Sequence, residues 1–243
     1  MIDRIVGWID ERTGIRSSLG YLLDRKIPKG VNWWYTLGFA TLFVFILQVV
    51  SGSFLAMYYS ASPDHAFDSV EYINNEVVFG RVVRGIHHWG ASAMVALVFL
   101  HMLRVLVMGA YKYPRELTWI IGVVLFLLTL GFGFTGYLLP WDEKAYWATT
   151  VGTNMAGTLP MVGDYLLKII RGGADLGAVT LTRFYAIHVL VLPGAIVMFI
   201  ALHMYLVVKH GISYPPEIVD TCPPYTAPTL KAPSTLGRRR GSQ

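Results

Sequence analysis

Cysteine is nearly absent from this chain of 243 residues, which has a single one, Cys222. One cysteine cannot form an internal disulfide, and it cannot supply the several thiolates of a structural zinc or iron–sulfur site. Charged residues are also scarce, because Asp, Glu, Lys and Arg together make up 14% of the sequence. A typical soluble domain carries about 25%. In a sequence with 54% hydrophobic residues, this deficit of charge indicates a protein that lies in lipid.

Four apolar stretches are long enough to cross a bilayer, which requires about 20 consecutive apolar residues. They span roughly residues 33–58, 84–109, 117–139 and 184–208. We therefore predict an all-α integral membrane protein whose four transmembrane helices form one bundle domain over residues 31–214.

The segments outside these stretches differ from one another in composition. Residues 1–30 begin with MIDRIVGWIDERTGI, which alternates charged and apolar residues at helical spacing and predicts a helix on the membrane surface, not a cleaved signal peptide. The loop 140–183 is long for a membrane connection, and we expect DEKAYWATTV and PMVGDYLLKIIRG to form short helices within it. Residues 215–243 are rich in Pro, Thr and Ser, which predicts an extended or disordered tail.

The charges in the loops predict an orientation. Basic residues are concentrated in the segments that share one side of the membrane with both termini: Arg4, Arg12, Arg16, Arg25, Lys26, Lys29, Lys112, Arg115, Lys209, Lys231 and Arg238 to Arg240. The opposite loops are mixed or acidic, with Asp64, Asp68, Glu71, Glu76, Asp142, Glu143, Asp164 and Asp175. The positive-inside rule then places both termini in the cytoplasm. No targeting segment is visible, so we expect the inner membrane of a cell. This bias accounts for the net charge of +5 without a nucleic-acid partner.

Four of the seven histidines lie inside the predicted spans, where polar side chains are costly and usually functional. His87 and His101 are 14 residues apart on the second span, and His188 and His203 are 15 apart on the fourth. A rise of ~1.5 Å per residue separates each pair by roughly 21–22 Å along its helix. The second and fourth spans run in the same direction, so His87 pairs with His188 on the outer side and His101 with His203 on the inner side.

Two imidazoles per iron leave no open coordination position, which suits a haem that transfers electrons. Zinc would need further ligands that a two-histidine site lacks. A single histidine could equally hydrogen-bond a neighbouring helix, but four in matched pairs favour two bis-histidine b haems. The sequence alone also leaves open a transporter that relays protons through intramembrane histidines.

Glycines repeat the histidine spacing on the two spans that lack these histidines. Gly38 and Gly52 are 14 apart on the first span, and Gly122 and Gly136 are 14 apart on the third. Glycine allows a large rigid ring to approach the backbone closely, so we expect a haem edge against each. Ordinary small-residue packing between helices is the alternative, and it does not explain two pairs at this period.

Cationic side chains flank the histidine levels and are candidates to bind the anionic haem propionates. Arg84 lies one turn before His87, and Arg104 lies one turn after His101. Further candidates at the same two surfaces are Arg115 and Arg183. Each arginine also has an alternative role as a snorkelling membrane anchor. Lys209 lies at the inner mouth, where a quinone or a lipid headgroup would meet it.

Several runs of sequence are distinctive in combination. They are FGRVVRGIHHWGASAMVALVFLHMLRV (79–105), YPRELTWIIGVVL (113–125), GFGFTGYLLPWD (131–142), LTRFYAIHVLVLP (181–193) and HGIS (210–213). Together they resemble the cytochrome b/b6 family over about residues 1–214. The spacing of 15 between His188 and His203 is similar to that of cytochrome b6 and the short bacterial menaquinol-type subunits.

This resemblance implies a subunit of a quinol:cytochrome c or quinol:plastocyanin oxidoreductase. In such a complex, a Q cycle passes electrons from quinol at the outer side through two b haems to a quinone at the cytoplasmic side, and this is coupled to proton translocation. Pro140, Trp141, Tyr146 and Trp147 match the family segment that lines the outer quinol pocket. The implied partners are a Rieske iron–sulfur protein, a c-type cytochrome and a second copy in a dimeric complex.

Two departures from the family pattern change what is expected. The PEWY motif that completes the outer quinol pocket is absent, since PPE at 215–217 does not match it. A separate subunit that contains PEWY is therefore implied. Thr36 stands where several relatives have the cysteine that tethers a third haem, so no covalent third haem is expected. A di-haem membrane anchor of another respiratory dehydrogenase is the remaining alternative, although such anchors lack the paired glycines and the PWD loop.

Overall fold

The computed structural model describes residues 2–15, 20 and 30–213. The predictions for the tail 215–243, with Cys222, lie outside these residues, as does most of the segment 16–29. The described chain is helical, with η1 (Trp33–Thr36), α3 (Leu37–Ala56), α5 (Gly80–Val107) and α6 (Glu116–Leu138) in three of its long helical runs. The fourth run joins α9 (Ala178–Ala186), η2 (Ile187–Val191) and α10 (Leu192–His210). Shorter helices are α1 (Ile2–Thr13), α4 (Ala66–Asn75), α7 (Glu143–Gly157) and α8 (Gly163–Arg171).

The prediction of four spanning helices is confirmed. Four helical runs of the described chain are long and apolar enough to cross a membrane: Trp33–Ala56, Gly80–Val107, Glu116–Leu138 and Ala178–His210. The second and fourth begin several residues before the predicted boundaries at 84 and 184. Hydropathy marks only the part of a helix that suits lipid, whereas backbone hydrogen bonding continues through the polar residues at either end.

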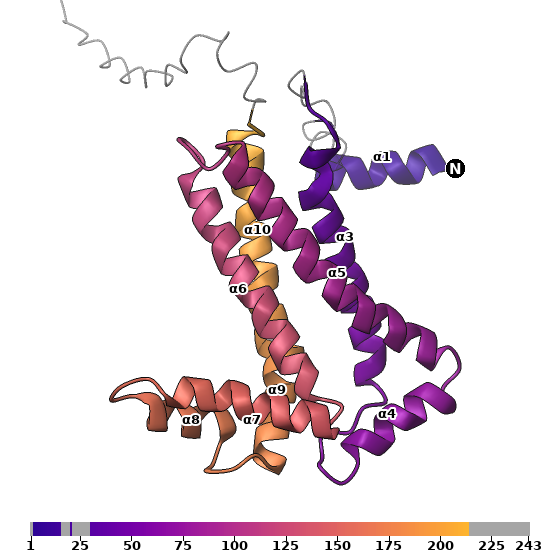
Figure 1. Ribbon diagram of the computed structural model, residues 1–243. Coiled ribbons are helices and arrows are strands. Elements are labelled where there is room, and N and C mark those ends of the chain that lie inside the picture. The colour runs from indigo at the N-terminus through magenta and orange to yellow at the C-terminus, as the bar shows by residue number, and fades with distance from the viewer. Residues whose placement is uncertain (1, 16–19, 21–29, 214–243) are drawn as a thin grey trace, which may run out of the picture.

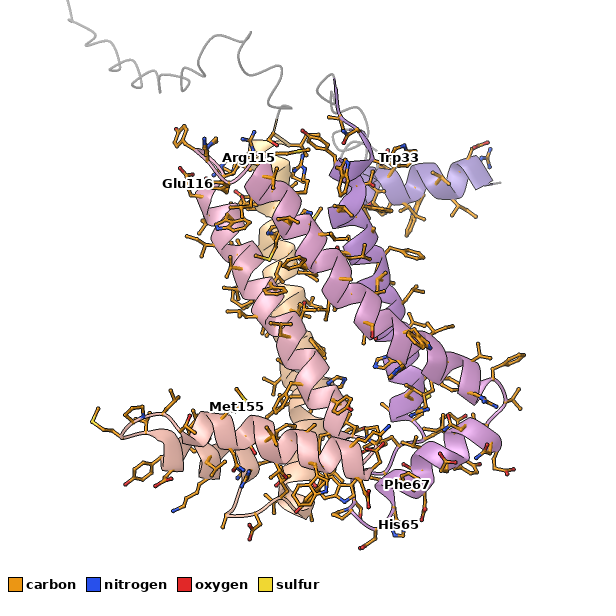
Figure 2. The ribbon with its side chains drawn as sticks, in the orientation of Figure 1. Trp33, His65, Phe67, Arg115, Glu116 and Met155 are labelled. Carbon is orange, nitrogen blue, oxygen red and sulfur yellow. The ribbon has the colours of Figure 1, made fainter. Side chains whose placement is uncertain are left out.

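The four runs are arranged as two pairs, since α3 packs chiefly against α5 and α6 chiefly against α10 (Figure 1). We call the end with α4, α7 and α8 the loop end, and the end where α3 and α6 begin and α10 ends the terminal end. Figure 2 shows Trp33, Arg115 and Glu116 at the terminal end and His65 and Phe67 at the loop end. Helix α1 lies across the bundle direction at the terminal end, and its Ile5 and Trp8 are exposed.

Helix α4 lies between the first two spans, where the sequence analysis predicted no helix. Its buried residues Ala66, Val70 and Ile73 follow a helical spacing and face inward. The chain turns from α4 into α5 through Phe79, whose φ of 61° is left-handed. A side chain at Gly80 would meet the carbonyl of Ile73, so glycine permits this close approach between the two helices.

The loop 140–183 forms short helices as predicted, and a buried arginine connects them. Asp142 caps α7, because its Oδ1 accepts a hydrogen bond of 2.7 Å from the backbone N–H of Ala145. From the last residue of α8, Arg171 donates through Nε to Thr153 Oγ1 at 2.9 Å and through Nη2 to Asn154 Oδ1 at 2.8 Å. Its Nη1 donates to the carbonyl of Ala174 at 3.2 Å. These bonds fix α7, α8 and the following turn to one another.

A small apolar core at the loop end joins this loop to the bundle. It consists of Ala66, Leu138, Leu181 and Phe184, with Tyr59, Leu139, Trp141 and Ile170 packed around them. The Tyr59 hydroxyl donates a 2.7 Å hydrogen bond to the carbonyl of Leu139. Burial, together with the nearby Tyr185, raises the pKa of Tyr59 above its usual value, so this hydroxyl stays neutral and remains a donor.

Candidate functional site

Two histidines from different helix pairs face each other near the loop end. His87 is on α5 and His188 is in η2. Their ring centroids are 6.5 Å apart and their planes are inclined by 72°. Two metal–imidazole bonds of about 2.0 Å each, together with the two ring radii, place centroids about 6 Å apart. The observed separation therefore fits one metal ion held between the two rings.

The second pair lies at the terminal end of the same helices. His101 is on α5 and His203 is on α10, and the two imidazoles are close enough to interact electrostatically. At ~1.5 Å per residue, His101 lies roughly 21 Å along α5 from His87. The structure thus brings the four histidines together in the predicted pairs. Among the described residues, no three His, Cys, Asp or Glu side chains converge as a metal cluster would require.

Each predicted glycine lies against one of these imidazoles. A Cβ on Gly52 would be 2.9 Å from His87 Cε1, and a Cβ on Gly136 would be 2.7 Å from His188 Cε1. At the terminal end, the corresponding distances are 3.1 Å from Gly38 to His101 and 3.6 Å from Gly122 to His203. The sequence predicts a macrocycle edge at these positions, and the structure adds that an imidazole ring lies beside each glycine. The two loop-end contacts leave no room for a methyl group.

The spacing of 15 residues on the fourth span is explained by a π-turn. His188 lies within η2, where the N–H of Leu192 bonds to the carbonyl of Ile187, five residues earlier. A π-turn adds one residue to a helix without a corresponding α-helical advance. The 15 steps from His188 to His203 therefore act as about 14 α-helical steps, which is the spacing of His87 and His101 on α5. Both histidines of each pair can thus lie at the same level.

Two hydroxyl groups contact the loop-end histidines from behind. Ser51 Oγ is 3.0 Å from His87 Nδ1, and Thr135 Oγ1 is 3.0 Å from His188 Nδ1. The sequence interpretation missed both residues. A signal was present, because a hydroxyl residue immediately precedes each loop-end glycine, whereas Leu37 and Ile121 precede Gly38 and Gly122.

Of the cationic candidates, Arg104 has the least satisfied hydrogen bonding. Its guanidinium carbon lies 3.6 Å from the centroid of the Tyr35 ring. Its Nε and Nη2 are buried and have no hydrogen-bond partner among the described residues, and the same holds for the Tyr35 hydroxyl. A buried guanidinium without a partner is costly. The site therefore fits an anionic group, such as a haem propionate, at the terminal end.

The other cationic candidates already have contacts within the chain. Arg115 donates through Nε to the carbonyl of Gly211 at 3.1 Å, and burial, with a contribution from nearby Arg104, lowers its pKa from the usual value. Arg84 donates to Asn74 Oδ1 at 3.4 Å, and Arg183 donates to the carbonyl of Ile169 at 2.9 Å. Lys209 is exposed, with its Nζ 5.9 Å from the centroid of the Tyr205 ring. The three arginines are bonded to the protein itself and Lys209 is exposed, which makes Arg104 the strongest anion-binding candidate.

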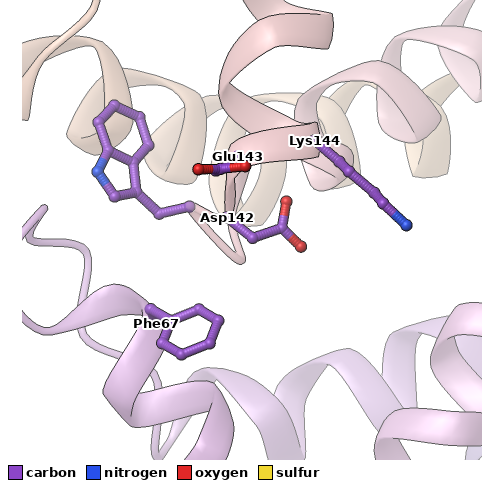
Figure 3. Close-up of a pocket in the computed structure, with 5 residues that line it drawn as sticks. Phe67, Asp142, Glu143 and Lys144 are labelled. Carbon is purple, nitrogen blue, oxygen red and sulfur yellow. The ribbon is translucent and has the colours of Figure 1, made fainter.

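A hollow at the loop end is lined by Phe67, Trp141, Asp142, Glu143 and Lys144, with a volume of about 510 Å³. Figure 3 shows Phe67 of α4 facing Asp142 and Glu143 across it. Of the aromatic residues predicted to line an outer quinol pocket, Trp141 lies in this wall. Tyr146 packs edge-on against Trp141 and Trp147, with centroid separations of 5.8 and 5.4 Å. Pro140 precedes this aromatic group in the turn that ends α6.

Comparison with known proteins gives consistent matches over most of the chain. The sequence pattern of the family described as Cytochrome b/b6/petB matches residues 22–211. The chain is 48% identical over 223 residues to the menaquinol:cytochrome c reductase cytochrome b subunit of Bacillus subtilis (strain 168), and the match covers 88% of this chain and 100% of that protein. It is 43% identical over 214 residues to cytochrome b6 of Synechococcus elongatus, with coverage of 88% and 100%.

A solved structure has the same fold. It is described as a hyperthermophilic respiratory Complex III, and one of its chains matches with a TM-score of 0.82 and 34% sequence identity. The match covers 94% of this chain and 59% of the solved chain, so the solved chain continues well beyond the matched part.

Proposed function

This chain belongs to the cytochrome b/b6 family, and we propose that it is the cytochrome b subunit of a quinol:cytochrome c or quinol:plastocyanin oxidoreductase. Family membership implies haem b and an interaction with quinone. The observation that carries the proposal is the pair of histidine levels, each with one imidazole from α5 and one from the fourth helical run. A quinol oxidoreductase of this kind requires such a path from one membrane face to the other.

In this proposal, His87 and His188 are the axial ligands of one haem b, and His101 and His203 are those of a second. Haem b with two imidazole ligands supplies one-electron transfer without an open position for oxygen. The protein fixes the geometry of the ligands. Each imidazole can lie close to a neighbouring helix backbone because that helix has a glycine there, namely Gly38, Gly52, Gly122 or Gly136.

The cationic residues divide between the two ends of the bundle. We assign Arg104 to a propionate of the terminal-end haem, because its Nε and Nη2 are buried without a hydrogen-bond partner among the described residues. Arg84 is placed to serve a propionate at the loop end by releasing Asn74, to which its hydrogen bond is long. Arg183 flanks the same surface. Arg115 and Lys209 border the terminal end, where we place the quinone that is reduced.

The charge bias of the loops orients the subunit in the membrane. We propose that the terminal end faces the cytoplasm, with both chain termini, and that the loop end faces outward across the inner membrane of a cell. Quinol oxidation then takes place near the aromatic group of Trp141, Tyr146 and Trp147. Electrons leave at the cytoplasmic side, and the uptake and release of quinone protons on opposite faces gives proton translocation.

The subunit needs partners for the complete reaction. The relative from Bacillus subtilis is described as one subunit of a menaquinol:cytochrome c reductase, and the matched solved chain extends beyond this one. We propose a separate subunit with a PEWY motif, a Rieske iron–sulfur protein and a c-type cytochrome, in a dimeric complex surrounded by lipid. Thr36 has no thiol, so no covalent third haem is expected at that position.

Haem stoichiometry and quinol-dependent reduction test this proposal. In the purified complex, a reduced-minus-oxidised spectrum and a pyridine haemochrome assay should give two haems b per copy of this chain. A quinol should reduce both, and the chain should carry no haem stain after denaturing electrophoresis. Absence of a b-type band would instead favour proton relay by the histidines, and reduction by a dehydrogenase subunit but not by quinol would favour the membrane-anchor alternative.

A further inference from the structure

The two histidine levels differ in one respect, which is a hydroxyl group behind the ligands at the loop end. Ser51 Oγ and Thr135 Oγ1 are each 3.0 Å from an imidazole Nδ1. At the terminal end, His203 Nδ1 is buried and has no hydrogen-bond partner among the described residues. No hydroxyl contact to His101 or His203 occurs within the described chain. Within the described chain, the hydroxyl contact is therefore what distinguishes the two ends.

The hydrogen bonds of the hydroxyl groups determine the tautomer of the loop-end imidazoles. Ser51 Oγ donates to the carbonyl of Leu47 at 2.6 Å, and Thr135 Oγ1 donates to the carbonyl of Gly131 at 2.8 Å. Each hydroxyl has a single hydrogen, which these bonds use. Toward the imidazole it can therefore only accept. This arrangement places the ring hydrogen of His87 and His188 on Nδ1 and leaves Nε2 as the lone-pair nitrogen that binds a metal.

An acceptor at Nδ1–H also changes the electronic character of the ligand. It draws the ring proton outward and raises the basicity of Nε2. A more basic axial ligand favours ferric over ferrous iron, because it donates more strongly to the higher charge. The environment around axial ligands is one of the means by which a protein tunes haem potential.

We propose that Ser51 and Thr135 are positioning residues that fix the tautomer of the loop-end ligands and lower the reduction potential of the loop-end haem relative to the terminal-end haem. This inference rests on the proposed haem site at His87 and His188. The hydroxyl groups touch neither haem nor quinol and act through the imidazoles. A lower potential at the loop end would make electron passage toward the terminal end favourable.

Redox titration of the purified complex tests the inference, with the two haems followed by their optical bands. Thr135→Val keeps the size and branching of the side chain but removes the hydroxyl. Ser51→Ala removes the hydroxyl on α3. Each should raise the potential of the loop-end haem and leave the other unchanged. The expected size is about tenfold in the ratio of reduced to oxidised haem at a fixed potential, or ~59 mV for one electron. Thr135→Ser should restore the original value.

Thr129→Val is the matched control, because Thr129 is buried on the same helix and donates to the carbonyl of Leu125 at 2.9 Å without contacting a histidine. It should change neither potential. If both haems are retained and the loop-end potential does not move in Thr135→Val and Ser51→Ala, the inference is wrong although the haem assignment stands. Loss of the loop-end haem from both variants would also overturn it, since the hydroxyl groups would then act in retention and not in tuning. A wild-type complex without two b haems would refute the proposed function itself.

Discussion

His87 and His188 face each other with their ring centroids 6.5 Å apart and their planes inclined by 72°. At this distance the rings neither stack nor bond to one another, so their separation is set by what lies behind each ring. His87 is held against Gly52 and Ser51 of α3, and His188 against Gly136 and Thr135 of α6. Each imidazole is thus positioned by its own helix pair. A metal between them would meet a ligand geometry that already exists.

Removal of one histidine should therefore affect one haem and not both. We expect His203→Ala or His101→Ala to reduce the haem b content from two per chain to about one, with loss of the terminal-end haem only. The pyridine haemochrome assay and the redox titration measure this. His88→Ala is the control, since His88 is exposed, packs edge-on against Trp89 and should leave both haems in place. Loss of both haems from His203→Ala would contradict the independence of the two levels.

The glycine contacts predict a graded series of alanine substitutions. A methyl group at Gly136 would be 2.7 Å from His188, whereas one at Gly122 would be 3.6 Å from His203, which is an ordinary contact. Gly136→Ala should displace the imidazole and lower the loop-end haem content severalfold, and Gly122→Ala should retain the terminal-end haem. Haem content per chain, with helix content by circular dichroism as a check on folding, decides between them. Equal losses in both variants would show that small size serves helix packing instead.

The charge of Arg104 should raise the potential of the terminal-end haem, because a nearby cation stabilises the reduced and less positive iron. Arg104→Gln removes the charge and is expected to make one-electron reduction of that haem less favourable by a free energy on the order of 1–2 kcal/mol, and Arg104→Lys should recover part of it. Arg84→Gln is the control for the potential of the terminal-end haem, because Arg84 lies at the other end, where it donates to Asn74. An unchanged terminal-end potential in Arg104→Gln would rule out the assignment of Arg104 to a propionate.

If the π-turn only absorbs an extra residue, deletion of Leu190 should be tolerated. Leu190 lies in η2 and is 71% exposed, and its deletion would leave His188 and His203 14 residues apart. Both haems should be retained, with a regular α-helix in place of the π-turn. Deletion of Phe99, which is exposed in the regular helix between His87 and His101, should rotate one histidine by about 100° and remove a haem. Retention of both haems in the Phe99 deletion would refute this account.

Arg171 should stabilise the loop-end helices without affecting haem binding. Arg171→Met removes hydrogen bonds to Thr153, Asn154 and the Ala174 carbonyl, of which the one to Thr153 is buried. We expect a destabilisation of about 1–3 kcal/mol, seen as a lower thermal midpoint and faster proteolysis of the loop 140–183. Lys168→Met, an exposed position on the same helix, is the control. Loss of a haem from Arg171→Met would indicate a role beyond this loop.

The sequence predicted the features that follow from regular helical periodicity. Four spans and the levels of the histidines and glycines could be found because an α-helix repeats every 3.6 residues or so, and the family resemblance is confirmed. The roles of the histidines, glycines and arginines as cofactor contacts stay predictions. The π-turn at Ile187–Val191 could not be predicted from an ideal-helix argument, because that argument assumes 3.6 residues per turn throughout. The hydroxyl contacts of Ser51 and Thr135 depend on side-chain rotamers and helix crossing, which spacing does not specify.

The distance between the two histidine levels has an electrical consequence. The step of roughly 21 Å along α5 crosses about 70% of a hydrocarbon core ~30 Å thick. In the proposed orientation, an electron that moves from the loop end to the terminal end travels against a membrane potential that is negative inside. The work is about 1.6 kcal/mol for each 100 mV. In the proposed arrangement, the chain would therefore sense the voltage that its complex helps to generate, and a large membrane potential would hold electrons back at the loop end.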